Sequence, residues 1–284
     1  MDKKFAPDYV NLKMGSWLGW QIETNWTNIW FYAFYSLVRP IASTLILVFI
    51  FLVVAKGQLS HPLFPYIYIG NAFFMYVYMV LFGISWVIHE DREHYQMLKY
   101  IFITPRRMYY FLAGRGLAKL AITTFAVLVT LVFGKLALGV PINLGTTNYF
   151  YLISGLILGL IGISALGVIL AALSMVTAHH SFYLTEGIAG LFYLISGAIY
   201  PIDVLPGWLK SLALGFPLTY WVELLRRALG VTYESQILGK ISSPQLLLIL
   251  FVSTVVLVGL SSLIYKLFER ISVKYGLVDR LTNY

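Results

Sequence analysis

The stretch that decides the fold runs from Tyr149 to Val176 and reads YFYLISGLILGLIGISALGVILAALSMV. It carries no charged side chain and is longer than the roughly 20 apolar residues that a helix needs to cross a bilayer. Its glycines, Gly155, Gly159 and Gly162 among them, allow helices in a membrane to approach closely. We expect them to pack helices within one chain, with a seam between two copies as the alternative.

Five further stretches are similarly apolar, at residues 35–55, 66–88, 117–138, 182–200 and 246–265. The whole chain of 284 residues is 60% hydrophobic and 11% charged, against about 25% charged residues in soluble domains. So few charges cannot cover a soluble surface, which excludes an ordinary soluble enzyme and a disordered chain. We therefore predict an all-α polytopic membrane protein, a single transmembrane domain over residues 1–284 with six transmembrane helices.

The basic residues predict an orientation in the cell membrane. Of the 20 lysines and arginines, 14 fall in the N-terminal part through Arg39, between Arg92 and Lys119, or from Lys266 onward. Because loops rich in lysine and arginine stay in the cytoplasm, both termini and the loop at residues 89–116 are predicted to be cytoplasmic. The net charge of +8 is then a topology signal, and we expect no nucleic-acid partner.

The N-terminal segment, residues 1–34, contains a helical pattern. Leu18, Ile22, Trp26 and Ile29 recur at helical spacing, with polar residues opposite them. The pattern predicts an amphipathic helix over Trp17–Tyr35 that lies in the cytoplasmic interface and contacts membrane lipid. The alternative is an N-terminal extension of the first span.

The cytoplasmic loop begins HEDREHYQMLKYIFITP at residues 89–105. A charged start is followed by residues that form one apolar helix face, and the residue before a proline avoids the helix. This pattern suits a short helix that docks on a soluble partner, and a solvated loop that only orients the spans is the alternative. The candidate docking residues are Glu90, Asp91, Arg92, Glu93, Tyr95, Leu98, Thr104 and Pro105.

The external segment, residues 201–245, is apolar and aromatic but too interrupted by prolines to span. Short re-entrant or interfacial helices fit this pattern best. Glu223 and Arg226 are three residues apart and can pair on one helix face, where they serve interfacial anchoring or direct substrate contact. The candidate residues are Pro201, Pro206, Trp208, Pro217, Tyr220, Glu223 and Arg226.

Glu186 is an acidic residue in the opening turns of the span at 182–200. We consider it a candidate inner gate together with His179 and His180, or a partner of Arg39 or Lys119, with exposure at the interface as the alternative. The span interiors otherwise lack acidic side chains, which argues against an ion-coupled secondary transporter.

Sites for metal or covalent catalysis are not expected. The chain has no cysteine. His89 and His94 are five residues apart, so they miss the four-residue spacing of a zinc protease helix. His179 and His180 are adjacent, so their side chains diverge. An intramembrane hydrolase is therefore a minor alternative.

Two segments resemble the membrane subunit of ABC-2 type exporters. The first carries Glu90, Arg92, Glu93, Leu98 and Thr104-Pro105, with Gly114-Arg115 after them. The second carries Gly197, Pro201, Leu205-Pro206, Trp208-Leu209, Pro217-Leu218-Thr219-Tyr220, Glu223 and Arg226. Tyr95-Gln96 departs from the Gly-Thr of many relatives, which puts the detail of docking in doubt. The segment Trp26–Pro40 looks closer to drug-export and antibiotic-resistance permeases than to polysaccharide permeases.

The resemblance implies a permease subunit of an ATP-driven exporter. A second permease copy or homologue would complete the pathway, and ABC ATPase subunits would bind ATP and magnesium, so that this chain binds no cofactor. Independently, the chain has no G-x-x-x-x-G-K-[ST] motif for ATP phosphates. We expect export of a hydrophobic or amphipathic molecule, drug-like or lipid. The alternatives are export of polysaccharide or lipid-linked glycan, and a secondary transporter or channel without an ATPase.

Overall fold

The structure is a computed structural model that describes residues 8–103, 108–143, 145–177, 181–231, 233 and 235–277, with the backbone alone at 181 and 182. This part of the chain is helical and contains no strand. Its elements are α1 (Asp8–Thr24), α2 (Ile29–Val54), α3 (Leu63–Tyr76), η1 (Val77–Phe82), α4 (Gly83–His89), η2 (Glu90–His94), α5 (Leu98–Ile103), α6 (Met108–Ala137), α7 (Tyr149–Val176), α8 (Ser181–Ile195), η4 (Ile202–Val204), α9 (Gly207–Leu214), α10 (Pro217–Ala228), η5 (Leu238–Lys240) and α11 (Ser243–Lys274).

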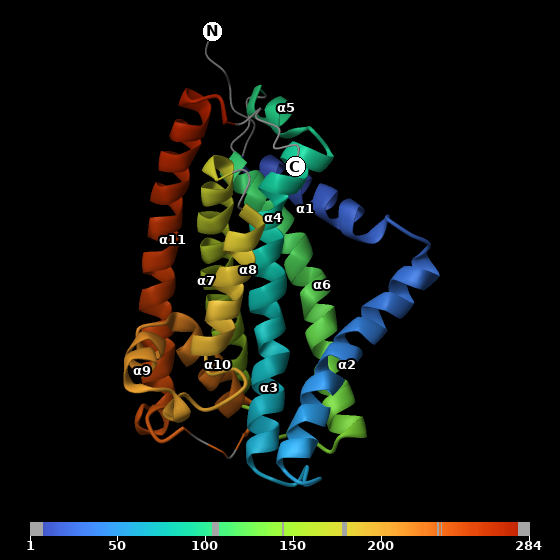
Figure 1. Cartoon of the computed structure of the whole chain (residues 1–284), viewed down its shortest axis with the longest axis vertical. Coiled ribbons are helices and arrows are strands. Elements are labelled where there is room, and N and C mark those ends of the chain that lie inside the picture. Colours follow the sequence, from blue (N-terminus) through green and yellow to red (C-terminus); the bar gives the residue numbers. More distant parts are fainter. Residues whose placement is uncertain are drawn as a thin grey trace.

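The long helices form one bundle (Figure 1). Five helical segments are long and apolar enough to cross a membrane, namely 29–54, 63–94, 108–137, 149–176 and 243–274. The prediction of an all-α multi-pass membrane protein is confirmed. We call the end of the bundle that carries α1 and α5 the α5 end, and the opposite end, with α9 and α10, the α10 end.

The predicted fifth span is shorter than expected. It corresponds to α8, which has 15 residues and is therefore only about 22 Å long, less than the roughly 30 Å of the hydrocarbon core. The chain turns at Gly197, whose φ of +68° suits glycine, and Pro201 follows. Figure 1 shows α8 running beside α7 toward α9 and α10. The count of six spans therefore stays a prediction.

The predicted single helix over Trp17–Tyr35 is wrong. Helix α1 ends at Thr24 and α2 begins at Ile29. The Asn28 side chain accepts the backbone N–H of Trp30 at 3.2 Å, and this capping bond starts a new helix. The opening of α2 then continues into the first span, as the alternative interpretation had it, and Figure 1 shows α2 splayed away from the bundle there.

Helix α1 packs on α6 through small residues and not through its apolar side chains. A Cβ atom on Gly15 would lie 2.3 Å from the carbonyl oxygen of Phe111, and one on Gly114 would lie 2.3 Å from that of Leu12. Gly15 is buried, whereas Trp17 is 64% exposed. Glycines thus bring the two backbones together, and the large side chains of Met14, Trp17 and Trp20 face outward.

The glycines of α7 pack helices of the same chain, as predicted. A Cβ on Gly159 would lie 2.0 Å from Nε1 of Trp221 in α10. That nitrogen donates to the Gly155 carbonyl at 2.9 Å. Gly167 lies against Ile84 of α4 in the same way. The glycine-rich stretch is therefore the central helix against which α4 and α10 pack.

The close approach of α1 and α6 yields a first prediction. Gly114→Ala places a methyl group against backbone atoms that cannot move without separating the helices, so we expect a loss of about 1–3 kcal/mol in stability, as for other overpacked sites. Thermal denaturation of the purified protein in detergent measures the loss. Gly187→Ala in α8 is the control, because a Cβ there meets no atom within 4 Å; equal melting of both variants would contradict the packing role.

Candidate functional site

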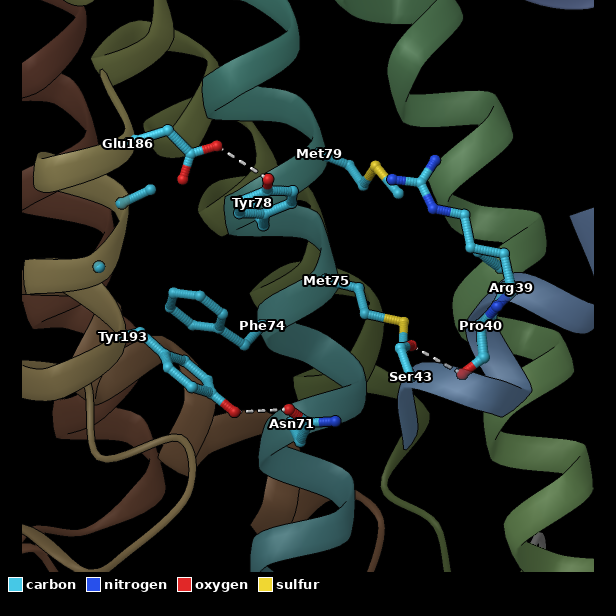
Figure 2. Close-up of a pocket in the computed structure, with 13 residues that line it drawn as sticks. Arg39, Pro40, Ser43, Asn71, Phe74, Met75, Tyr78, Met79, Glu186 and Tyr193 are labelled. Carbon is cyan, nitrogen blue, oxygen red and sulfur yellow. Dashed lines mark hydrogen bonds between the residues drawn. The ribbon is translucent and has the colours of Figure 1, made fainter. Parts of the chain in front are cut away.

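A groove of about 430 Å³ lies between α2, the α3–η1 segment, α6 and α8. Figure 2 shows its residues projecting from these walls. Most of its lining is apolar. The lining residues are Arg39, Pro40, Ser43, Asn71, Phe74, Met75, Tyr78, Met79, Ala126, Glu186, Ala189, Gly190 and Tyr193. A volume of this size, with a few polar groups on apolar walls, is typical of a small-molecule site.

The α3–η1 wall contributes polar and flexible apolar side chains. Turns of π-helix interrupt the helix at Val77–Phe82, and such insertions are frequent at functional sites. Tyr78 in this segment donates its hydroxyl to Oε1 of Glu186 at 3.0 Å. At the other end of the groove, the Tyr193 hydroxyl donates to Oδ1 of Asn71 at 2.8 Å. These bonds link α8 to the α3–η1 wall at two levels (Figure 2).

A second hollow of about 490 Å³ adjoins the groove toward the α1–α2 turn. The two hollows share Arg39, Pro40, Tyr78, Met79 and Ala126 as lining residues. The second one also contains an ion pair between Lys119 of α6 and Glu23 of α1. The shared residues show that the two hollows lie next to each other along α2.

The predicted partners of Glu186 are corrected by this geometry. Lys119 pairs with Glu23, and the Arg39 guanidinium lies over the Tyr35 ring at 5.4 Å from its centroid. Glu186 instead binds Tyr78. Arg39 and Glu186 nevertheless line the same groove. His179 and His180, the other candidate gate residues, lie outside the described residues.

The charged residues predicted to dock on a partner form a cluster at the α5 end. Arg115 of α6, 2% exposed, donates to Oε2 of Glu90 at 2.7 Å and lies 3.5 Å from Oδ1 of Asp91. Arg92 binds Glu93 at 3.1 Å. Both Asp91 and Arg92 are buried. Burial and pairing fix these side chains to the bundle, which leaves little of them for a partner.

Helix α5 presents the exposed part of the predicted docking region. Gln96, with a φ of +49°, separates α5 from η2. Leu98 is buried, whereas Tyr95, Tyr100 and Ile103 are exposed. Thr104 and Pro105 lie outside the described residues. The docking role stays a prediction, and the surface available for it combines these aromatic and apolar side chains with the exposed Lys99.

Arg226 of α10 is held in a cage of carbonyl groups at the α10 end. Its Nε donates to the Tyr66 carbonyl at 2.9 Å, and its Nη2 donates to the carbonyls of Gly197 and Ala198 at 2.9 and 2.6 Å. The guanidinium also lies 3.5 Å from the centroid of the Tyr66 ring, an attractive cation–π geometry. Burial lowers the pKa of Arg226, and Tyr66 and Glu223 oppose that shift.

Glu223 binds Arg227 more closely than Arg226. The distance is 3.0 Å from Oε1 to Nε of Arg227 and 3.9 Å from Oε2 to Nη1 of Arg226. Arg227 also donates to the carbonyls of Ile241 and Leu238, at 2.7 Å each. Glu223 and Arg226 are both buried, and their roles in interfacial anchoring or substrate contact stay predictions. They join α10 to the segments around it.

The other candidates at the α10 end have separate positions. Pro201 and Pro206 precede η4 and α9, and Pro217 opens α10. Tyr220 donates its hydroxyl to the Leu214 carbonyl. Trp208 is 68% exposed. These positions terminate or start short helices, and only Trp208 offers a large free surface.

The sequence interpretation missed most of the groove. Asn71, Met75 and Met79 lie in an apolar span and carry no motif. The sequence interpretation also missed Gly70, which leaves room for Arg226, since a Cβ there would lie 1.9 Å from Nη2 of Arg226. Tyr78 differs from its apolar neighbours only by one hydroxyl. The sequence signals for the groove were Glu186 and its candidate partner Arg39, two charged residues in apolar spans.

The cage predicts that Arg226 is a structural residue. Arg226→Ala leaves three carbonyls without this buried donor, and we expect a loss of about 3 kcal/mol or more, because each unsatisfied buried polar group costs about 1–3 kcal/mol. Arg226→Lys should lose less but remain destabilised, because an ammonium lacks the planar fork. The midpoints of thermal denaturation of the purified variants in detergent measure these losses. Lys210→Ala in the neighbouring α9 is the control, and midpoints equal to that of the control would refute the structural role.

The model of the ABC-2 type transporter family matches residues 17–229. A comparison with curated proteins gave no match. The matched range includes the groove, the charged cluster at the α5 end and the Arg226 cage. The chain therefore belongs to the ABC-2 type transporter family and is a multi-pass membrane permease.

Proposed function

We propose that this permease is the membrane subunit of an ATP-driven exporter that moves a hydrophobic or amphipathic molecule, drug-like or lipid, out of the cell. The observation that carries the proposal is the groove along α2. Its walls combine Phe74, Met75 and Met79 with a few charged and hydroxyl groups. Methionine side chains adapt to ligands of varied shape, which favours an apolar or amphipathic cargo over a hydrated glycan.

The energy for export would come from a separate ABC ATPase that binds ATP and magnesium. The family supports an ATPase partner in general. We place it at the α5 end, because most of the basic residues of the sequence belong to the segments predicted to be cytoplasmic. A second copy of the permease, or a homologue, would complete the pathway in the cell membrane.

Export driven by ATP yields a transport prediction. The protein is purified with the soluble P-loop ATPase that accompanies it from its own membranes, and the complex is reconstituted in liposomes with a fluorescent alkyl amphiphile. We expect movement of the amphiphile with ATP and magnesium, and none with a non-hydrolysable ATP analogue. Equal movement without ATP would contradict the proposal and favour a secondary transporter or channel.

The exposed face of α5 yields a docking prediction. Tyr100→Ala combined with Ile103→Ala should reduce the amount of ATPase that co-purifies about tenfold or more, because each removes an exposed apolar contact, and such anchors dominate interfaces. The melting temperature of the permease should stay unchanged. Trp208→Ala, an exposed aromatic at the opposite end, is the matched control.

The same experiment separates docking from folding. Arg115→Ala should lower the melting temperature, because it removes the buried partner of Glu90 and Asp91. Undiminished co-purification of the ATPase with the α5 variant would refute a docking role for this face.

A further inference from the structure

Two opposite charges face the groove from two different helices. Arg39 projects from α2 and Glu186 from α8, and Figure 2 shows both extending toward the α3–η1 wall that carries Tyr78 and Met79. Both charges act electrostatically on the Tyr78 hydroxyl. The groove therefore has a positive wall and a negative wall around Tyr78.

The positive charge lacks an acidic partner in the part of the chain that the structure describes. Of the acidic side chains that line the two hollows, Glu23 pairs with Lys119 and Glu186 accepts a hydrogen bond from Tyr78, and neither forms an ion pair with Arg39 among the described residues. Arg39 itself is exposed, and its contact is the Tyr35 ring. A guanidinium in a membrane helix is costly without a counter-charge, and arginine suits phosphate and carboxylate geometry. The position thus favours an anionic group in the groove.

The negative charge has capacity for a second partner. Oε1 of Glu186 accepts one hydrogen bond, from Tyr78. An ionised carboxylate accepts several bonds through its two oxygens. Glu186 is only half-buried and lines the groove, so an ammonium group in the groove can reach it.

The depth of these charges suits the headgroup of an amphiphile. Trp26, Trp30 and Tyr35 precede Arg39 by one to a few turns, and tryptophan and tyrosine concentrate at membrane interfaces. On the far side of the charges, the groove is lined by Phe74 and Met75 and is bounded by the Tyr193–Asn71 hydrogen bond. The charged groups at one depth of the groove are thus followed by an apolar region that suits an alkyl chain.

We infer that the groove binds a zwitterionic amphiphile, with its phosphate at Arg39, its ammonium at Glu186 and its alkyl chain along Phe74, Met75 and Met79. The inference deepens the proposed function, because it names the charge pattern of the molecule that the permease takes up.

Three amphiphiles with the same alkyl chain test this inference, an alkylphosphocholine, an alkyl phosphate and an alkyltrimethylammonium. Their binding to the purified full-length chain is measured by titration calorimetry in a non-ionic detergent. We expect the phosphocholine to bind most tightly. Arg39→Gln should weaken the phosphocholine and the phosphate about tenfold, the usual effect of one lost charge-assisted hydrogen bond, and leave the ammonium unchanged.

Glu186→Gln should give the complementary pattern, with weaker phosphocholine and ammonium binding and unchanged phosphate binding. A charge pair that only held α2 to α8 would weaken all three probes together in both variants, and that outcome would overturn the inference. Unchanged affinities in both variants would overturn it as well, and would mean that an uncharged molecule or a second copy of the chain fills the groove.

Matched variants control for charge and folding. Lys135→Gln removes an exposed cation from α6 outside the groove, and Glu269→Gln removes a carboxylate beside Tyr265 in α11. Neither should alter any of the three affinities. Arg39→Lys retains the cation and should restore most of the phosphate binding. Melting temperatures of all variants confirm that the bundle is folded.

The binding test uses neither ATP nor the ATPase, so it can succeed where the proposed function fails. Reconstitution with the ATPase then separates the two sources of such a ligand. Movement of the phosphocholine with ATP identifies a transported cargo, and binding without movement identifies a lipid of the surrounding bilayer. Both results support the site. If Arg39→Gln does not selectively weaken the phosphate probe and Glu186→Gln does not selectively weaken the ammonium probe, the site is refuted whatever the transport assay shows.

Discussion

The structure depends on how backbone carbonyls are satisfied where the chain turns back in an apolar environment. After α8, the carbonyls of Gly197 and Ala198 have left the helix, and Arg226 donates to both of them and to the Tyr66 carbonyl. Unsatisfied backbone groups are costly in a membrane, so one guanidinium joins α3, the turn after α8 and α10. Gly70 leaves room for it, and Trp221 then fixes α10 to Gly155 of α7.

The groove exists because α2 is not packed in the same way as its neighbours. The break at Asn28 directs the start of α2 away from the bundle, and the charge cluster around Arg115 holds the α4–η2 segment to α6 at the α5 end. Between these fixed points, α2 and α8 face each other across η1. A rigid centre and a loosely covered side are a suitable arrangement for a permease that must open and close.

Much of the fold followed from composition and periodicity. Five of the six apolar stretches lie on the long helical segments, because helix length and hydropathy depend on residues close together in sequence, and the glycines of 149–176 pack helices of the same chain. Predictions about partners were less accurate. Glu186 binds Tyr78 rather than Arg39 or Lys119, and the acidic residues Glu90 and Asp91 face Arg115. Charge alone does not tell which of several neighbours a side chain meets.

The sequence by itself determined that this chain is a helical membrane protein, since 11% charged residues cannot cover a soluble surface, and it indicated the family through fixed offsets around Pro201–Arg226. The tertiary structure decided where the functional groups meet. Arg39, Tyr78 and Glu186 come from helices far apart in the chain, and no local sequence pattern shows that they lie close together. The groove arises from the crossing of α2, α3 and α8, a relation that appears only after the helices have packed.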